Sequence, residues 1–307
     1  MIFADGNILA RPQLVTLSVD LKAIRAVGLV IFDKDGTLIE LYHYWSQMVA
    51  LRARLICEAL GLDAEHAAGL RWALGVDEKA GRLRPEGPVG LKKREIVIQA
   101  AVDYLSSAGR RETKPACAAA FERADEESIQ DLGRFIRPIP GAQAVVDALH
   151  SHGCRVAVAT VDISRRAQLA VDFLGFGGKI DLVVGADQVA RAKPAPDMLH
   201  LILKTLAIKP SRAVMVGDAL TDLQMGLNAG LKASIGVLSG FAAAEQLRML
   251  TPFVVRDVSE IKVLPIDRLV EQAIIQPLPD ERLATLPPPI PVPKGAAQKI
   301  LKADREA

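Results

Sequence analysis

Short apolar segments that alternate with helical patterns are the feature that most restricts the fold of this chain. Four segments lack polar alternation, and a fifth is weaker: residues 27–32 (VGLVIF), 155–160 (RVAVAT), 180–184 (IDLVV), 213–216 (AVMV) and 233–237 (ASIGV). Strands that are buried on both faces of a sheet have this composition. Because helical patterns lie between the segments, we expect an α/β fold in which helices cover both faces of a parallel sheet.

The helices expected between these strands have recognisable ends. They are residues 142–150, 164–175, 196–206 and 221–229. Ser164 is expected to cap the N-terminus of its helix, and Gly230 follows the last helix, as glycine commonly does at a helix end. In such sheets the reactive groups lie beyond the carboxyl ends of the strands, so polar residues directly after a strand are informative.

The expected domain organisation follows from where this rhythm is interrupted. Residues 41–135 contain helical patterns and no convincing strand, which indicates a helical insertion between the first and second strands. The end of the chain is rich in proline and then charged, as in an extended appendage. We therefore expect these parts: an N-terminal extension (1–23), a catalytic core (24–40 and 136–263), a helical cap (41–135) and a proline-rich tail (264–307).

Composition restricts the class of protein. Half of the 307 residues are hydrophobic, as in a globular protein with a sizeable core. Lysine plus arginine (38) nearly balance aspartate plus glutamate (36), which argues against nucleic acid as a partner. No segment reaches the roughly 18 consecutive apolar residues of a membrane span, and the N-terminus lacks a signal-peptide pattern. Three scattered cysteines fit a reducing compartment, so we expect a cytoplasmic protein.

The strongest chemical signal directly follows the first expected strand, at Asp33, Lys34, Asp35 and Gly36. Two carboxylates separated by one residue can share a divalent cation, and oxygen ligands suit Mg²⁺. Asp33 can attack phosphorus to form an aspartyl-phosphate, and Asp35 can protonate the leaving oxygen and later deprotonate water. Taken alone, the same pattern also occurs in turns and calcium loops.

Further polar residues follow other expected strands. Asp218 follows the fourth strand as Asp33 follows the first, so the two can meet if these strands are neighbours. Asp222, four residues on, suits either a metal site or a helix N-terminus. The hydroxyl of Thr160, at the end of the second strand, can hold phosphate oxygens. Lys193 lies in a loop and can offset negative charge on a transferring group, although a loop lysine is more often solvated.

In this order, the four pieces resemble motifs one to four of the haloacid dehalogenase superfamily, over about residues 27–240. The helical segment is similar to the cap that this superfamily inserts after its first strand. Among its branches, the chain looks most similar to the phosphoglycolate phosphatase-like hydrolases, through residues 138–160 (PIPGAQAVVDALHSHGCRVAVAT). The resemblance implies a three-layer, Rossmann-like core with the first strand central and the fourth beside it. The implied roles are nucleophile Asp33, general acid/base Asp35, phosphate binders Thr160 and Lys193, and Mg²⁺ ligands Asp33, Asp35 (through its carbonyl), Asp218 and Asp222.

The implied function is Mg²⁺-dependent hydrolysis of a small phosphorylated metabolite. Asp35 argues against dehalogenation, because dehalogenases of the superfamily lack the second aspartate. A phosphomutase with the same aspartate pair stays open, as does a phosphonatase that uses Lys92 or Lys93. A non-catalytic binding module on the same fold is a further alternative, and the proline-rich tail could bind a protein partner.

Departures from the family pattern concern specificity. Val161 stands where relatives often have asparagine, and Asp162 follows it. Lys34 replaces an apolar residue between the two aspartates, so it either faces solvent or reaches the substrate. In the cap, the candidates for substrate contact are His43, Tyr44, Arg52 and Arg84, although aromatic residues here are more often packing between cap and core.

Overall fold

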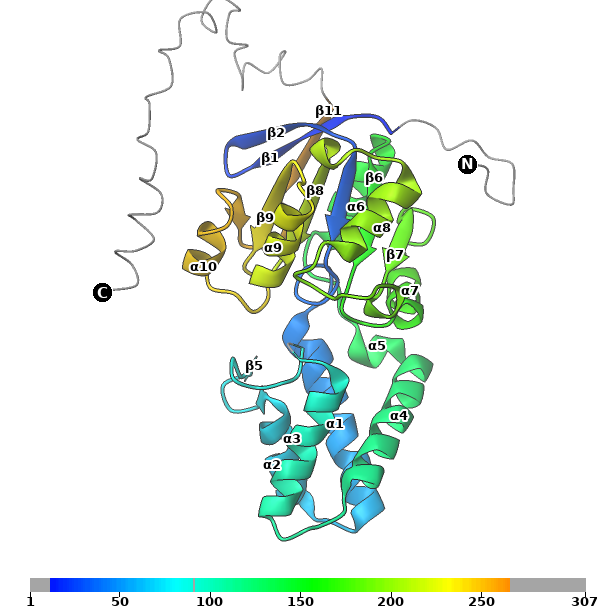
Figure 1. The fold of residues 1–307 in the computed structure, drawn as a ribbon, viewed down its shortest axis with the longest axis vertical. Coiled ribbons are helices and arrows are strands. Elements are labelled where there is room, and N and C mark those ends of the chain that lie inside the picture. The colour runs from blue at the N-terminus through cyan, green and yellow to red at the C-terminus, as the bar shows by residue number, and fades with distance from the viewer. Residues whose placement is uncertain (1–11, 91, 266–307) are drawn as a thin grey trace, which may run out of the picture. The chain divides into compact units, whose positions relative to one another are not determined.

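The computed structural model describes residues 12–90 and 92–265, and its central element is a six-stranded parallel sheet (Figure 1). From edge to edge its strands are β10 (Val254–Val255), β9 (Ala233–Val237), β8 (Ala213–Gly217), β3 (Leu29–Phe32), β6 (Arg155–Ala159) and β7 (Leu182–Val184). All five expected segments contribute to it. The sequence did not reveal β10, because two residues are too few to show a pattern.

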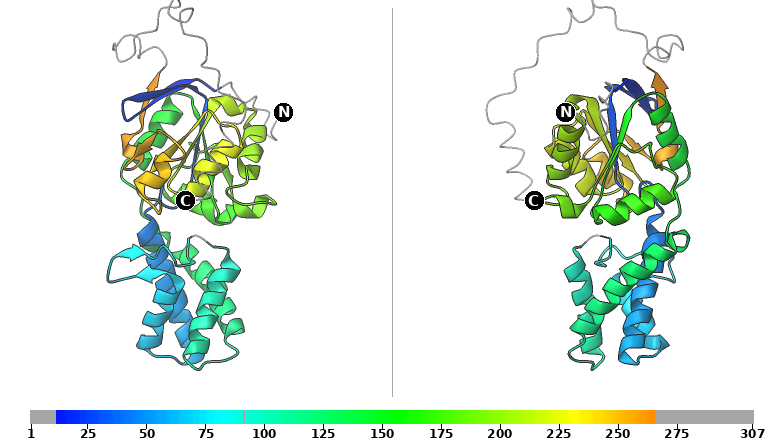
Figure 2. Two further views of the ribbon diagram at one scale, coloured as in Figure 1. Left: turned by 60° about the vertical axis from the view of Figure 1, so that its left-hand side comes forward. Right: turned by 90° about the vertical axis from the view of Figure 1, so that its right-hand side faces the viewer.

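Helices cover both faces of this sheet, which confirms the three-layer α/β core (Figure 1, Figure 2). In β3, Leu29 and Ile31 pack with apolar residues of α8 and α9 on one face. The alternate residues Val30 and Phe32 pack with those of α6 and α7 on the other face. The helices of the core are α6 (Ala142–Ser151), α7 (Ser164–Phe173), α8 (Asp197–Leu206), α9 (Leu220–Asn228) and α10 (Ala244–Arg248). Short 3-10 turns are η1 (Ala186–Gln188), η2 (Pro210–Arg212) and η3 (Val258–Glu260).

The N-terminus of α7 differs from the expectation. Ile163, not Ser164, is the N-cap residue. Ser164 is the first helical residue, and both its backbone N–H and its hydroxyl donate to the carboxylate of Asp187, each at 2.7 Å. A carboxylate from another segment therefore satisfies the helix start, which local sequence could not indicate.

A second, three-stranded antiparallel sheet was not expected from the sequence. Its order is β11 (Lys262–Pro265), β1 (Val15–Val19) and β2 (Lys22–Val27). The expected boundary at 23/24 falls inside β2, and the one at 263/264 falls inside β11. Val15, Leu17 and Val19 are fully buried, so part of the expected N-terminal extension packs into the hydrophobic core.

The helical insertion leaves the core after Ile39 and returns at Pro138, and these two residues form a β-bridge. Its elements are α1 (Leu41–Leu60), α2 (Ala64–Leu74), α3 (Arg94–Ser107), α4 (Lys114–Gln130), α5 (Leu132–Phe135) and the strands β4 (Val76–Asp77) and β5 (Arg82–Leu83). Along α1, Tyr44, Met48 and Ile56 recur at helical spacing and are buried. The two-residue strands form a hairpin that the sequence did not indicate.

Within residues 12–90 and 92–265, no helix combines the length and apolar character that crossing a bilayer requires. Beyond Pro265, the proline-rich tail lies outside the described residues.

Candidate functional site

Three buried carboxylates meet where two neighbouring strands end. Asp33 follows β3, Asp218 follows β8, and Asp222 lies in the first turn of α9. The strands β3 and β8 are parallel and in register at Phe32 and Val216, so the residues that follow them emerge side by side. One carboxylate oxygen from each aspartate lies within 4.8 Å of the others. From the sequence, Asp33 and Asp218 could meet only if their strands were neighbours. In the structure β3 and β8 are neighbours, and the two carboxylates lie close together.

Lys193 supplies the positive charge in contact with this cluster. Its Nζ lies 2.5 Å from Oδ1 of Asp33 and 2.7 Å from Oδ1 of Asp222. Burial by itself lowers the pKa of Lys193, but Asp222 and Asp33 outweigh it and raise the pKa. The side-chain amide of Asn228 donates to the carbonyl of Pro194 at 2.9 Å and so anchors the loop of Lys193 to α9. The loop lysine is therefore a fixed part of the site, not a solvated side chain.

Tight turns hold the carboxylate of Asp218. It accepts hydrogen bonds from the hydroxyl of Thr37 at 3.3 Å and from the backbone N–H of Phe241 at 3.0 Å. A Cβ on Gly240 would lie 1.7 Å from Oδ2 of Asp218, and one on Gly36 would lie 2.6 Å from the same oxygen. Gly36 also has a φ of +90°, a conformation that side chains disfavour. Only glycine fits at these two positions against the carboxylate.

Asp222 combines a contact at a helix start with a place in the carboxylate cluster. Its Oδ2 accepts a hydrogen bond from the backbone N–H of Ala219 at 3.1 Å, which satisfies a free donor at the start of α9. Its Oδ1 lies 2.7 Å from the Nζ of Lys193, and the carboxylate belongs to the cluster with Asp33 and Asp218. A carboxylate has enough lone pairs for both contacts.

The donor set fits a divalent cation. The three carboxylates are each at most 7% exposed, and Lys193 contacts only Asp33 and Asp222. Burial raises the pKa of Asp33 against the pull of Lys193. Burial, together with Asp33 and Asp222, raises the pKa of Asp218 well above its usual range. Crowded, buried carboxylates with too little positive charge are the environment that a hard, oxygen-preferring cation relieves.

The side chain of Asp35 lies outside this cluster and pairs with Lys34. The Nζ of Lys34 is 2.8 Å from Oδ1 of Asp35 and 3.3 Å from Oδ2 of Asp162. It also lies 4.7 Å from the ring centroid of Tyr44. Lys34 is 1% exposed, which excludes the solvent-facing alternative. Burial raises the pKa of Asp35, while Lys34 acts in the opposite direction.

The negative charge of Asp162 is compensated by two cationic side chains. Besides Lys34, the Nε of Arg166 lies 3.6 Å from Oδ1 of Asp162, one turn along α7. The backbone N–H of Asp162 donates to the hydroxyl oxygen of Thr160 at 3.1 Å. Thr160 is fully buried and directly follows β6, the other neighbour of β3. Its hydroxyl thus orders the loop that lies beside Asp33.

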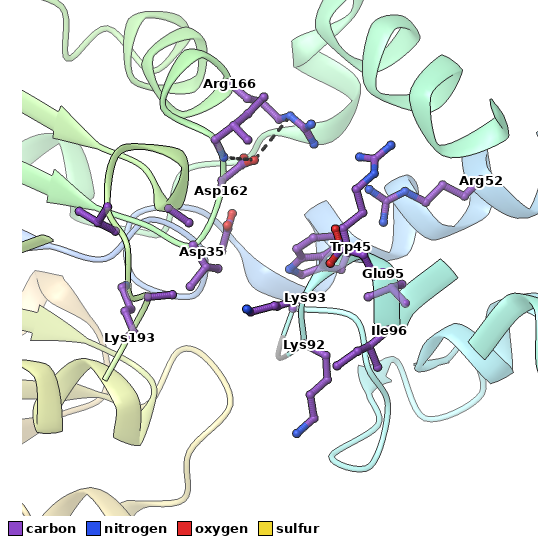
Figure 3. A pocket seen from close by; sticks show the side chains of 18 of the residues that line it. Asp35, Trp45, Arg52, Lys92, Lys93, Glu95, Ile96, Asp162, Arg166 and Lys193 are labelled. Atoms are coloured by element: carbon purple, nitrogen blue, oxygen red, sulfur yellow. Dashed lines mark hydrogen bonds and ion pairs between the residues drawn. The ribbon is translucent and has the colours of Figure 1, made fainter. Parts of the chain in front are cut away.

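A cavity of about 590 Å³ opens beside these groups (Figure 3). Asp35 and Lys193 line it from the core, and Trp45, Arg52 and Arg94 line it from the helical insertion. The volume is in the range of pockets that enclose small molecules.

The four cap candidates have different positions. Arg52 lines the cavity. Tyr44 is buried beside Lys34, and His43 is hydrogen bonded through Nε2 to the carbonyl of Arg134 at 2.9 Å. The guanidinium of Arg84 lies 4.1 Å from the ring centroid of Trp72. His43, Tyr44 and Arg84 are not among the residues that line this cavity.

Sequence reasoning missed Arg94 and Arg166, which line the cavity, and Asp125, which pairs with both of them. Asp125, Arg94 and Arg166 form an ion-pair cluster with Arg52. For Arg166, the spacing of four residues from Asp162 at a helix start was a usable signal. For Asp125, no local pattern exists, because its partners come from other helices.

Comparison with known proteins gives consistent matches. A family model described as a haloacid dehalogenase-like hydrolase matches residues 27–230. The chain is 30% identical over 239 residues to "Probable phosphatase IndB" of Dickeya dadantii, covering 75% of this chain and 89% of that protein. It is 25% identical over 238 residues to a phosphoglycolate phosphatase of Pectobacterium atrosepticum, covering 78% and 90%. A pyrophosphatase of Halalkalibacterium halodurans matches over only 59% of its length.

The fold is also similar to solved structures. One is described as a predicted phosphoglycolate phosphatase from Haemophilus somnus, with a TM-score of 0.56 and 19% identity, covering 76% of this chain and 96% of that one. A structure described as a putative β-phosphoglucomutase from Thermotoga maritima has a TM-score of 0.51 and 22% identity, covering 76% of this chain and 96% of that one. At these identities the likeness concerns the fold alone.

Proposed function

This chain belongs to the haloacid dehalogenase-like hydrolase family, and we propose that it is a Mg²⁺-dependent phosphatase that hydrolyses a small phosphomonoester through an aspartyl-phosphate on Asp33. The observation that carries the proposal is the cluster of Asp33, Asp218 and Asp222 with Lys193 beside a cavity of about 590 Å³. Two relatives that align over most of their own length are named as phosphatases.

The first half of the proposed reaction forms a covalent intermediate. A carboxylate oxygen of Asp33 attacks phosphorus, and the bond between phosphorus and the substrate's alcohol oxygen breaks. Asp35 donates a proton to that departing oxygen. Lys193, 2.5 Å from Oδ1 of Asp33, orients the nucleophile and offsets negative charge as the phosphoryl group transfers.

The second half releases phosphate. Asp35, now ionised, accepts a proton from a water molecule, and that water attacks the phosphorus of the aspartyl-phosphate. The bond between phosphorus and Asp33 breaks, which regenerates the carboxylate. Bound Mg²⁺ would be held by Asp33, Asp218 and Asp222 and would supply charge neutralisation for the carboxylates and the phosphate. Oxygen-only ligands favour Mg²⁺ over softer metals.

The test is release of free phosphate from a panel of phosphomonoesters with Mg²⁺ or with EDTA. We expect turnover only with the metal. Asp33→Asn should lower kcat by a factor of about 10³ or more, because it removes the nucleophile. Asp172→Asn, which changes an exposed carboxylate on α7, is the matched control and should retain activity. Retained turnover in Asp33→Asn would refute the mechanism, and phosphate recovered on a sugar acceptor instead of in water would indicate a mutase.

A further inference from the structure

Three guanidinium groups converge on one carboxylate at the wall of the cavity. Asp125 of α4 lies 3.0 Å from Arg166 and 3.5 Å from Arg52, and it also pairs with Arg94. These arginines come from α7, α1 and α3, and all three line the cavity. One carboxylate cannot neutralise three guanidinium groups, so positive charge is left over at this wall.

The neighbouring ion pairs do not remove this excess. Arg166 also faces Asp162, but Asp162 is shared with Lys34, which in turn pairs with Asp35. Across the whole cavity lining, six cationic side chains stand against three carboxylates. The positive electrostatic potential of this lining favours an anionic ligand.

Two of the three arginines, Arg52 and Arg166, have a buried Nε without a hydrogen-bond partner in the described part of the chain, and Arg52 is the less exposed of the two. Arg52 is 5% exposed. Its guanidinium lies 4.3 Å from the ring centroid of Phe121 and 5.8 Å from that of Trp45, so aromatic packing holds it in place. Burial lowers the pKa of Arg52 to about 10, and Asp125 offsets this only in part. A buried donor of this kind favours an acceptor from a ligand.

The position of this cluster defines a second end of the site. Figure 3 shows Lys193 and Arg52 on different sides of the cavity, with Arg52 directed into it from α1. Lys193 contacts Asp33, so the phosphoryl group to be transferred belongs at that end. The rest of the substrate then extends toward the arginines.

We propose that Arg52, Arg94 and Arg166 form a second anion-binding subsite, which receives a carboxylate or a second phosphate on the leaving-group part of the substrate. The inference rests on the proposed phosphatase function, because that function places the transferred phosphate at Lys193. Guanidinium groups recognise both anions through paired N–H donors. The substrate class is therefore a phosphomonoester with a second anionic group.

The experiment measures competitive inhibition of p-nitrophenyl phosphate hydrolysis, which reports binding whether or not a compound is itself hydrolysed. One matched pair is 3-phosphoglycerate and glycerol 3-phosphate, which differ by a carboxylate. The other pair is fructose 1,6-bisphosphate and fructose 6-phosphate, which differ by a phosphate. We expect the wild type to bind the more anionic member of one pair at least about tenfold more tightly, the size typical of charge-assisted hydrogen bonds. The pair that shows the preference identifies the anion.

Variants assign the preference to the arginines. Arg52→Met should reduce the preference to within about threefold, since it removes the charge and retains much of the volume. Arg54→Met is the matched control: Arg54 lies on the same helix, is half exposed and pairs with Glu58 at 2.6 Å, and its loss should leave the preference unchanged. Should Arg52→Met fail to fold, Arg94→Gln provides the same comparison at a more exposed position.

Two results would overturn the subsite. One is a wild type that binds both members of each pair equally. The other is an Arg52 or Arg94 variant that weakens both members to the same extent. If the wild type releases no phosphate from any monoester, including p-nitrophenyl phosphate, the proposed function itself is wrong, and that outcome is distinct from an absent preference.

Discussion

Asp218→Asn should stabilise the protein without metal and remove its stabilisation by Mg²⁺. The oxygens of Asp218, Asp33 and Asp222 lie within 4.8 Å of one another. At this separation and an effective dielectric constant of about 20, each pair of negative charges repels by about 3.5 kcal/mol. Lys193 contacts Asp33 and Asp222 but not Asp218, so the charge of Asp218 is compensated least.

The net gain is smaller than the gross repulsion. The raised pKa of Asp218 means that protonation relieves part of the repulsion in the metal-free protein. Asparagine has the same shape and can still accept from the N–H of Phe241. We therefore expect Asp218→Asn to raise the free energy of unfolding in EDTA by about 1–3 kcal/mol. In a domain of this size that corresponds to an increase in Tm of roughly 3–10 °C.

The assay is thermal and urea unfolding in EDTA and in excess Mg²⁺. The wild type should gain about 2.7 kcal/mol when Mg²⁺ is present at a hundred times its Kd, whereas Asp218→Asn should gain little. Asp125→Asn is the control, and its effect on the free energy of unfolding should have the opposite sign. It removes a carboxylate that three arginines neutralise, so it should destabilise the fold and leave the response to Mg²⁺ intact. A lower Tm for Asp218→Asn in EDTA, or an unchanged Mg²⁺ response, would refute the electrostatic reasoning.

The effect of Asp125→Asn should also depend on pH. Burial raises the pKa of Asp125, but its arginine partners outweigh this and hold the pKa below the usual 3.8. The stabilisation by its charge is thus complete above pH 3.8 and is lost as the pH falls through the folded-state pKa. In acid unfolding curves, the free energies of unfolding of the wild type and of Asp125→Asn should therefore converge as the pH falls. Lys34→Met should lower the free energy of unfolding by about 3 kcal/mol, because Asp35 loses its cation in a buried setting. Urea unfolding that gives equal stabilities for Lys34→Met and the wild type would contradict this.

Much of the core could be predicted from the sequence because its strands are marked by local patterns of residues. A strand buried on both faces is a run of apolar residues, as in β3 (LVIF), and the following Asp33 must then emerge at the sheet edge. The same holds for β8 and Asp218. The second sheet could not be predicted in this way. Half of the residues of β2 (KAIRAV) are exposed, so the strand is no continuous apolar run, and β11, which pairs with β1, comes more than 200 residues later in the chain.

The sequence by itself determined the α/β architecture and the identity of the carboxylates at the strand ends, since strand order and a common sheet edge bring such residues together. Only the tertiary structure decided which cap side chains reach the cavity: Arg52 does, and Arg84 instead stacks on Trp72. It also decided that Lys34 is buried between two carboxylates. The physical reason is that these outcomes depend on contacts across long sequence separations, such as the 73 residues between Arg52 and Asp125. Packing of whole helices, and no local pattern, sets such contacts.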